Sequence, residues 1–454
     1  MPKKKTALTI EERLQQALVP AEEQPYEVPE NWVWVRLGSL YEVNPKNKAA
    51  DELDAAFIPM EKISAGMLSE YSYETQEWCK AKKGHTQFAD GDVAFAKISP
   101  CFENRKSMML NNLPNSIGGG TTELIILRNA SINQKYTFWL VSDERFIRGG
   151  VQTYSGTVGQ QRINMDYVRS YPIPLPPLSE QQRIVERIEE LFAKLDEAKE
   201  RLQEVADSFA VRKAAILHKA FTGELTKQWR RENGVSDESW EESNFGKFTV
   251  SQYGYTEKAH WEKVGPKFLR ITDIQDNKVD WDEVPWCPID EAGMKQYAVQ
   301  IGDIMIARTG ATTGKSYLIC DDVEAVFASF LIRLKVVDKN LDYNYLYGYM
   351  QSEDYWRQIT DFSSGIAQPG VNANKLKQIK FKCPSLPEQH EIVRLIDDLL
   401  ARERSAQQAT EQALASIDLM KKSILARAFR GELGTNKASE ASALELLKQV
   451  LAEN

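Results

Sequence analysis

Three short stretches contain residue types that are used in catalysis, but none has the spacing that catalysis requires. Residues 310–316 read Gly-Ala-Thr-Thr-Gly-Lys-Ser, with three residues between the glycines. A phosphate-binding loop needs four residues there and a helix after the lysine. The following Tyr317-Leu-Ile-Cys320 is typical of a strand. We therefore expect a glycine-rich hairpin and no nucleotide site.

The other two stretches are Gly118-Gly-Gly120 and Glu197-Ala-Lys199. The first is a flexible loop without a dinucleotide fingerprint, and the second falls on the surface of a helical pattern. The four histidines and five cysteines are scattered without metal-ligand spacing. No catalytic-triad spacing and no N-P-P-aromatic motif of amino-group methylation occurs. The sequence predicts a non-catalytic chain with no metal and no cofactor of its own.

Several polar segments instead carry side chains that suit DNA. Phosphate contacts use Lys, Arg and small hydroxyl or amide donors, and base reading uses Arg, Asn, Gln, Ser and Thr. Such segments occur in parallel positions in both halves of the chain, which strengthens the pattern. In the first half the predicted DNA contacts are Lys97, Ser99, Asn104, Arg105, Lys106, Thr121, Thr122, Ser155, Thr157, Gln160, Gln161, Arg162 and Asn164. In the second half they are Arg308, Thr309, Thr312, Thr313, Lys315, Ser363, Ser364, Gln368, Asn372, Asn374 and Lys375.

Two long helices are expected to position these segments, because one helical sequence occurs twice. Residues 178–225 and 386–433 align without a gap, and such a repeat organises the chain. Ser179 and Gln182 have capping-box spacing. Apolar residues from Ile184 through Val205 to Phe209 recur in steps of four and three, as in a heptad seam. A continuous helix would be about 60 Å long, so its seam needs a partner.

The second copy interrupts this seam with Glu403 and Thr410. Two interpretations are open. Either the two helices pair antiparallel and the polar residues set the register, which we favour, or this middle contacts another protein. The predicted coiled-coil or partner positions are Ile184, Ile188, Leu191, Leu195, Leu202, Phe209, Phe221, Ile392, Ile396, Leu399, Ile417 and Phe429.

The repeat predicts two copies of a unit made of a globular domain followed by a long helix. Smaller expected elements are a short helix over residues 7–18, a helix from Tyr136 to Phe146, and strands in Gly91–Ile98 and Thr122–Leu127. The second domain shows no clear counterpart of Trp32–Leu37. The expected divisions are an N-terminal extension over 1–29, a first domain over 30–174, a first repeat helix over 175–226, a linker over 227–247, a second domain over 248–383, a second repeat helix over 384–434 and a helical tail over 435–454.

Composition sets wider bounds. The length of 454 residues exceeds one core, and the net charge of −8 is unusual for a nucleic-acid binder. That charge motivates an alternative, a coiled-coil adaptor that binds only proteins. The unpaired cysteine pattern favours a reducing compartment. Because no apolar run is long enough for a membrane span, we expect a cytoplasmic protein with no membrane partner.

The order of these motifs resembles the DNA-specificity subunits of type I restriction-modification systems. The resemblance rests on the paired segments P-P-L-S-E-Q-Q-R-I-V and P-S-L-P-E-Q-H-E-I-V, with A-F-T-G-E-L and A-F-R-G-E-L at the helix ends. It covers nearly the whole chain. The N-terminal extension and the tail from Ala438 to Ala452 lie outside the repeat.

The resemblance implies an α+β fold with two globular α/β target-recognition domains. Two long antiparallel helices separate them, with internal pseudo-two-fold symmetry. It also implies that each domain reads one half of a bipartite, asymmetric site in double-stranded DNA. The implied partners are two modification (methyltransferase) subunits, which carry S-adenosylmethionine and methylate adenine, and two restriction (motor-nuclease) subunits that can join for cleavage.

Overall fold

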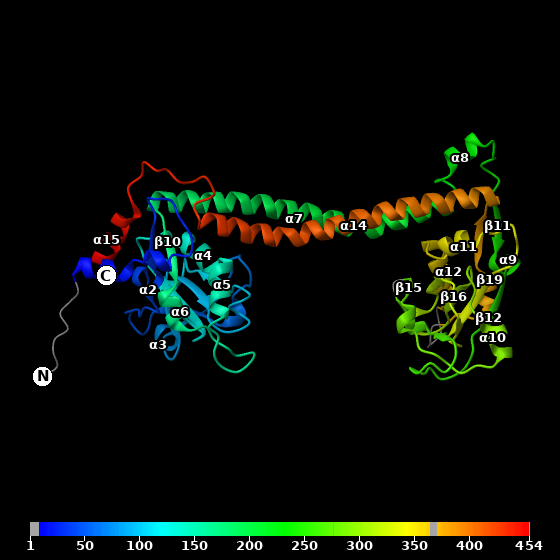
Figure 1. The fold of residues 1–454 in the computed structure, drawn as a ribbon, viewed down its shortest axis with the longest axis horizontal. Helices are drawn as coiled ribbons and strands as arrows, with labels where there is room; N and C mark the ends of the chain where they lie inside the picture. Colours follow the sequence, from blue (N-terminus) through cyan, green and yellow to red (C-terminus); the bar gives the residue numbers. More distant parts are fainter. Residues whose placement is uncertain (1–8, 276, 364–369, 454) are drawn as a thin grey trace. The chain divides into compact units, whose positions relative to one another are not determined.

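The computed structural model describes residues 9–275, 277–363 and 370–453, and the chain divides into two units. Unit 1 comprises Met1–Leu202 and Ala413–Asn454, and unit 2 comprises Gln203–Gln412. Each unit contains one globular domain and a part of both long helices (Figure 1). Within the described residues, no helix is long and apolar enough to cross a membrane.

The two long helices predicted from the repeat are confirmed. Helix α7 spans Leu178–Phe221 and has 44 residues, and helix α14 spans Leu386–Ala428 and has 43. Each is followed by a glycine in the left-handed region, Gly223 (φ 82°) and Gly431 (φ 72°). Glycine adopts this conformation at low cost, so it ends a helix cleanly.

Helices α7 and α14 run antiparallel, side by side within each unit (Figure 1). In unit 1, Lys421 Nζ lies 2.5 Å from the Asp196 carboxylate. In unit 2, Arg212 Nε lies 2.9 Å from the Glu403 carboxylate. The α14 partner number falls as the α7 number rises, which fixes the antiparallel direction. Glu403 is therefore satisfied by the facing helix, and this supports the interpretation that the polar residues set the register.

The apolar seam differs from the predicted one in detail. Ile184, Ile188, Ile392, Ile396, Phe209 and Ile417 are buried, and Leu191, Leu195, Leu202 and Leu399 are half-buried. Val205, predicted in the seam, is 40% exposed. A straight helix drifts away from a strict heptad repeat, so one stripe cannot stay buried along its whole length. Phe221 and Phe429 do not join the seam, because they pack into the globular domains against Tyr345 and Tyr136.

The first domain is built on two four-stranded sheets, in the orders β4-β3-β8-β5 and β2-β9-β6-β7. In the second sheet, β6 is buried throughout and β9 is buried except at Arg128. The strands of the first domain are β1 Val33–Arg36, β2 Glu42–Val43, β3 Asp54–Ile58, β4 Glu74–Glu77, β5 Thr86–Ala89, β6 Val93–Ala96, β7 Ser107–Met109, β8 Ile117–Gly120, β9 Leu124–Arg128 and β10 Pro172–Leu175. Its helices are α2 Leu37–Leu40, α3 Trp78–Ala81, α4 Gln134–Ser142, α5 Glu144–Val151 and α6 Met165–Ser170.

The helix predicted from Tyr136 to Phe146 is wrong in one respect, because the chain forms two helices there. Asp143 stands between α4 and α5 with extended backbone (φ −66°, ψ 141°), and its side chain accepts the N–H of Arg145. An aspartate in this position caps a new helix and so interrupts the old one. The strands predicted in Gly91–Ile98 and Thr122–Leu127 are confirmed as β6 and β9.

The second domain has a related plan, with one four-stranded sheet where the first domain has two. A four-stranded sheet has the order β12-β19-β16-β17, and the remaining strands pair in twos. Its strands are β11 Glu241–Asn244, β12 Thr249–Tyr253, β13 Lys267–Leu269, β14 Ile274–Gln275, β15 Lys278–Val279, β16 Ile304–Ala307, β17 Ser316–Leu318, β18 Ala325–Phe327, β19 Leu331–Val336 and β20 Lys380–Cys383. Its helices are α8 Lys227–Glu232, α9 Phe245–Phe248, α10 Glu291–Tyr297, α11 Tyr343–Tyr349, α12 Glu353–Ser363 and α13 Ala373–Lys377.

The second domain does have a counterpart of Trp32–Leu37, contrary to the sequence-based expectation. Strand β11 pairs antiparallel with β20 as β1 pairs with β10, and Trp240 precedes β11 as Trp32 precedes β1. Residues 241–247 therefore belong to the domain and not to a linker. The match is hidden in the sequence because β11 reads Glu-Glu-Ser-Asn, residues that are depleted in strands.

The glutamate of the repeated Glu-Gln pair is buried in both copies. Glu180 in unit 1 and Glu388 in unit 2 are fully buried. Trp32 Nε1 donates to Glu180 at 2.7 Å. Thr226 Oγ1 and Arg230 Nη1 both donate to Glu388 at 2.7 Å. Asn436, which follows the end of α14, also donates its Nδ2 to Glu180 at 2.8 Å. Because a buried carboxylate must be hydrogen-bonded, these contacts tie the start of each long helix to the segment that follows the end of the other.

The repeated glutamine has an equally regular position. Gln181 accepts the N–H of Asn133 at 3.0 Å, and Gln389 accepts the N–H of Asp342 at 2.8 Å. Asn133 and Asp342 are the caps of α4 and α11. Each glutamine therefore anchors the start of a domain helix, α4 or α11, to a repeat helix, and this explains why the Glu-Gln pair occurs in both copies.

The terminal segments pack on each other in unit 1. Helix α1, Ile10–Ala17, begins at a capping box formed by Thr9 and Glu12. Helix α15, Ala443–Glu453, buries one face that includes Leu447. Arg13 Nη1 donates to the carbonyl of Leu451 at 3.0 Å. The helical tail predicted from the sequence thus docks on the N-terminal extension of its own chain.

Candidate nucleic-acid interface

Predicted segments of the first domain meet where strand β6 ends. Lys97 follows β6 directly, and its N–H donates to the carbonyl of Glu123 at 2.8 Å. The Lys97 carbonyl accepts the N–H of Ile163 at 3.0 Å. Segments that are far apart in the sequence therefore form one surface. We call it the β6 surface, made of residues 97–99, 121–123 and 155–164.

An ion pair fixes the arginine of this surface. Arg162 Nη2 lies 2.7 Å from Glu123 Oε1, and Arg162 Nε lies 2.8 Å from Glu123 Oε2. The hydrogen bond from Arg162 holds the pKa of the Glu123 carboxyl below its ordinary value. A bidentate pair of this kind orients the guanidinium. The Arg162 side chain is still 42% exposed, so one edge of it can meet a phosphate or a base.

The β6 surface contains a loop, residues 155–162, that is closed by hydrogen bonds at its base and exposed at its tip. Ser155 and Arg162 exchange backbone hydrogen bonds of 3.1 and 2.9 Å. Val158 at the tip is 90% exposed. Gly156 and Gly159 have positive φ values of 111° and 83°, which sharpen the turn. Exposed backbone and short side chains on a closed loop suit insertion into a DNA groove.

The predicted residues of the first domain divide by exposure. Asn104, Thr122, Ser155, Thr157, Gln160 and Asn164 are exposed, and Lys97, Ser99, Arg105, Lys106, Thr121, Gln161 and Arg162 are half-buried. Ser99 Oγ donates to Glu103 at 2.8 Å. The exposed residues lie mainly in the loop of residues 155–162. This loop therefore presents most of the side chains that can contact DNA.

Three predicted contacts of the first domain have structural roles instead. The Arg105 side chain is 11% exposed, pairs with Glu144 and donates to the carbonyl of Ser142 at 3.0 Å. Lys106 Nζ donates to the carbonyl of Met60 at 3.0 Å. The Asn164 side chain caps α6. Each of these side chains has a hydrogen-bond partner within the chain, which fixes its orientation.

The second domain places an arginine where the first has Lys97. Arg308 follows strand β16, donates its N–H to the carbonyl of Phe330 at 3.1 Å and accepts the N–H of Val371 at 2.9 Å. Its guanidinium lies 5.0 Å from the ring centroid of Tyr253. This stacking holds the arginine at the surface. We call this the β16 surface, made of residues 308–315, 329–330 and 370–375.

Phe330 takes the structural place of Glu123 and was missed in the sequence. The two residues correspond because each offers its carbonyl to the basic residue after the central strand. Phe330 is 59% exposed. Exposed aromatic rings beside arginine can stack on bases. Its only sequence signal is an aromatic residue in a turn between two strands, which is a weak one.

The glycine-rich hairpin expected at residues 310–316 is confirmed. Strands β16 and β17 pair antiparallel around it, and Ser316 begins a strand, not a helix. Thr313 Oγ1 donates to the carbonyl of Gly310 at 2.8 Å. Lys315 is exposed, and Thr309 and Thr312 are half-buried. The hairpin thus presents a cation and hydroxyl groups but forms no phosphate-binding loop.

The last predicted segment is only partly described. Ser364 and Gln368 lie outside the described residues, and Ser363 is the last residue of α12. Asn374 is exposed. The Asn372 side chain caps α13, and Lys375 Nζ donates to the carbonyl of Phe362 at 2.6 Å. As with Asn164, these last two side chains have hydrogen-bond partners within the chain.

The Gly-Asp pair shared by both domains is also structural. Asp92 is fully buried and accepts two hydrogen bonds from Arg128, of 2.7 and 2.6 Å. Asp303 is 1% exposed and lies 3.3 Å from Arg333. Each arginine comes from the strand next to the aspartate, so the pairs brace the central sheets. Among the described residues, no group of three His, Cys, Asp or Glu could hold a metal ion.

Comparisons with known proteins agree with this arrangement. A family model, "Type I restriction modification DNA specificity domain", matches residues 29–207 and 239–414. The type I restriction enzyme EcoAI specificity subunit of Escherichia coli is 27% identical over 470 residues, which cover 84% of this chain and 80% of that protein. The EcoEI specificity subunit of Escherichia coli is 37% identical over 182 residues, 39% of this chain and 31% of that protein.

A solved structure shares the fold. The crystal structure of the HsdS subunit from Thermoanaerobacter tengcongensis aligns with a TM-score of 0.67 at 19% identity, and it covers 90% of this chain and 99% of that one. The two family matches begin at equivalent points of the internal repeat and together span most of the sequence. The chain belongs to the family of type I restriction-modification DNA specificity proteins.

Proposed function

We propose that this chain reads a bipartite, asymmetric site in double-stranded DNA, with one half-site for each domain. As a family member it is the DNA-recognition, non-catalytic subunit of a type I restriction-modification complex. The observation that supports two different half-sites is a contrast at one structural position. The β6 surface has the Glu123–Arg162 pair, and the β16 surface has the exposed Phe330 beside Arg308. Different side chains at equivalent positions of the two domains read different bases.

The remaining predicted contacts are part of this proposal. Lys97, Ser99, Thr121, Thr122 and the loop around Thr157 would act in the first half-site. Lys315 and the hydroxyl groups of the glycine-rich hairpin would act in the second. The net charge of −8 limits the affinity of the chain alone, since phosphate contacts supply most of the binding free energy. Partner subunits would contribute the missing phosphate contacts.

Two modification subunits are the proposed partners, each with S-adenosylmethionine for adenine methylation. The chain has repeat-equivalent apolar residues exposed on the two long helices, Val211 at 70% and Leu419 at 66%. An exposed apolar residue at equivalent places in both copies suits two copies of one partner. Two restriction subunits would join the complex for cleavage. We place this assembly in the cytoplasm, with its DNA.

A domain exchange tests the proposal. Residues 30–174 are replaced by the corresponding domain of another family member, and the methylated sites of the host genome are sequenced. We expect one half of the site to change and the other half to stay. A change in both halves would contradict the modular assignment. The alternative, an adaptor that binds only proteins, predicts no DNA retention in a gel shift at low salt with the modification subunit present.

A further inference from the structure

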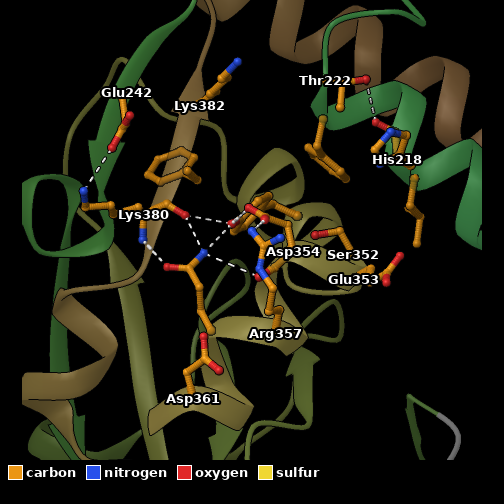
Figure 2. A pocket seen from close by; sticks show the side chains of 15 residues that line it. His218, Thr222, Glu242, Ser352, Glu353, Asp354, Arg357, Asp361, Lys380 and Lys382 are labelled. Atoms are coloured by element: carbon orange, nitrogen blue, oxygen red, sulfur yellow. Dashed lines mark hydrogen bonds and ion pairs between the residues drawn. The ribbon is translucent and has the colours of Figure 1, made fainter.

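A pocket of about 540 Å³ opens in unit 2 beside the end of α7 (Figure 2). Its floor is apolar and consists of Leu217, Phe221, Tyr349 and Phe381, each at most 9% exposed. Figure 2 shows a polar rim around it, with His218 and Thr222 on one side, Glu242, Lys380 and Lys382 on the other, and Asp354 and Arg357 from α12 between them. An apolar floor with a polar rim is typical of a site that receives one side chain.

The floor is held by a hydrogen-bond network. The Tyr349 hydroxyl donates to Asp354 at 2.8 Å and accepts from Gln358 Nε2 at 2.9 Å. Gln358 Oε1 accepts the N–H of Lys380 at 2.8 Å. These bonds join α11, α12 and β20, so the pocket keeps its shape without an occupant. Ordering the pocket therefore costs little of the binding free energy when a group enters.

Unit 1 contains the repeat-equivalent pocket. It lies beside the end of α14, against α5, and Ala426, Arg148 and Arg430 stand where unit 2 has His218, Arg357 and Thr222. The two pockets are therefore two copies of one structural feature. The two pockets differ in the side chains that the segment before β1 or β11 contributes to them.

The chain's own Tyr26 forms part of the lining of the unit 1 pocket. Its ring centroid is 4.8 Å from that of Trp34, and the guanidinium groups of Arg145 and Arg430 lie 5.5 and 5.3 Å from the ring. Its hydroxyl donates to the carbonyl of Phe429 at 3.2 Å, at the end of α14. Burial raises the pKa of Tyr26 to about 12. An extended segment containing Pro25 and Pro29 delivers this side chain.

Unit 2 uses the corresponding segment differently. Residues 227–232 form helix α8, and within the described part of unit 2 no residue from 226 to 240 lines the pocket. The place of Trp34 is taken by Glu242, and the places of Arg145 and Arg430 by Asp354 and Thr222. The apolar floor is kept, while the two positions whose arginines face Tyr26 in unit 1 carry no cation in unit 2.

We propose that the unit 2 pocket receives a tyrosine side chain from an extended segment of a partner protein. By analogy with Tyr26, the tyrosine hydroxyl donates to the carbonyl of Phe221 at the end of α7. The rim carries four carboxylates against three cations, Arg357, Lys380 and Lys382. The segment therefore carries a basic residue next to its tyrosine. This inference does not depend on the reading of DNA.

The test uses the full chain and a peptide based on residues 24–29, acetyl-Gln-Pro-Tyr-Lys-Val-Pro-amide. Saturation-transfer NMR and calorimetry follow binding to the wild type and to two variants. Thr222→Trp fills the pocket mouth, and we expect at least tenfold weaker binding. Glu242→Trp restores the aromatic wall of unit 1, and we expect binding at least threefold tighter. A gain of affinity cannot come from misfolding, so this variant keeps the proposal testable.

Matched controls separate the pocket from other surfaces. Lys213→Trp places a tryptophan on an exposed position of α7 and should leave the affinity unchanged. The peptide with alanine in place of tyrosine should lose binding in every variant. Equal binding of the tyrosine and alanine peptides, or equal affinity of the wild type and both pocket variants, would overturn the proposal. So would the absence of binding at millimolar peptide.

Discussion

The ion pair of the β6 surface predicts a specific pH dependence of stability. Arg162 lowers the pKa of Glu123 below its ordinary value of 4.5. A lowered carboxyl pKa contributes stability above the unfolded pKa, and this contribution is lost as the pH falls through the folded value. The Glu123 side chain is 21% exposed and that of Arg162 is 42% exposed, so we expect at most about 1 kcal/mol.

Thermal unfolding of the wild type and of Glu123→Gln tests this expectation. At pH 7 the variant should melt slightly lower. The difference should shrink as the pH falls below 4.5, because the wild-type carboxyl is then protonated as well. A difference that stays constant down to pH 2 would show that the charge of Glu123 does not matter to the fold.

The exposed ring of Phe330 predicts a selective loss of DNA binding. Phe330 is 59% exposed, so Phe330→Ala should cost little stability. If the ring stacks on a base, the substitution should cost about 1–3 kcal/mol of binding free energy. Gel shifts with the modification subunit present measure this loss. Val250→Ala, at another exposed apolar position of unit 2 (52%), is the matched control and should bind DNA as the wild type does.

At the scale of elements, the buried glutamates predict a strong effect on stability. Glu388→Ala removes the buried carboxylate that pairs with the guanidinium of Arg230, whose side chain is 6% exposed, and leaves the exposed Asp237 at 3.0 Å as the remaining carboxylate. Removing one partner of a buried ion pair costs about 3–5 kcal/mol. Glu391→Ala, one turn further along α14, breaks only the surface pair with Arg394 and should cost less than about 1 kcal/mol. Urea unfolding compares the two, and equal midpoints would refute the structural role of Glu388.

The long helices were predictable because their signal is strong and local. A gapless repeat with heptad spacing defines both the bounds and the antiparallel pairing of α7 and α14. The interruption at Asp143 was not predictable in the same way, since an aspartate is compatible with either a helix interior or a cap until its side chain finds the N–H of Arg145. Strand β11 was hidden because its polar residues are stabilised by pairing with β20, which is remote in sequence.

The candidate site was predictable in its position but less so in its members. The segments at Lys97 and Arg308 were found because basic and small polar residues gather after a buried strand. Arg105 and Lys375, predicted as DNA contacts, donate to carbonyls of their own chain, and a sequence does not show which cations do so. Phe330 was missed because its exposure comes from the turn between β18 and β19, and composition alone makes phenylalanine a core residue.

For the whole molecule, the repeat makes the long helices candidates for a ruler between the half-sites. The boundary of the two units falls at Leu202 in α7 and after Gln412 in α14. Seven residues inserted after Leu202 and seven after Gln412 keep the heptad register of both helices. The insertion lengthens each helix by about 10 Å, which corresponds to about three base pairs of duplex at roughly 3.4 Å each. We expect methylome sequencing to show a spacer longer by about that amount, with unchanged half-sites.

Seven residues inserted at Gly234, outside both helices, should leave the spacer as it is. An unchanged spacer in the helix variant would mean that the DNA or the partner subunits, and not α7 and α14, set the distance between the half-sites.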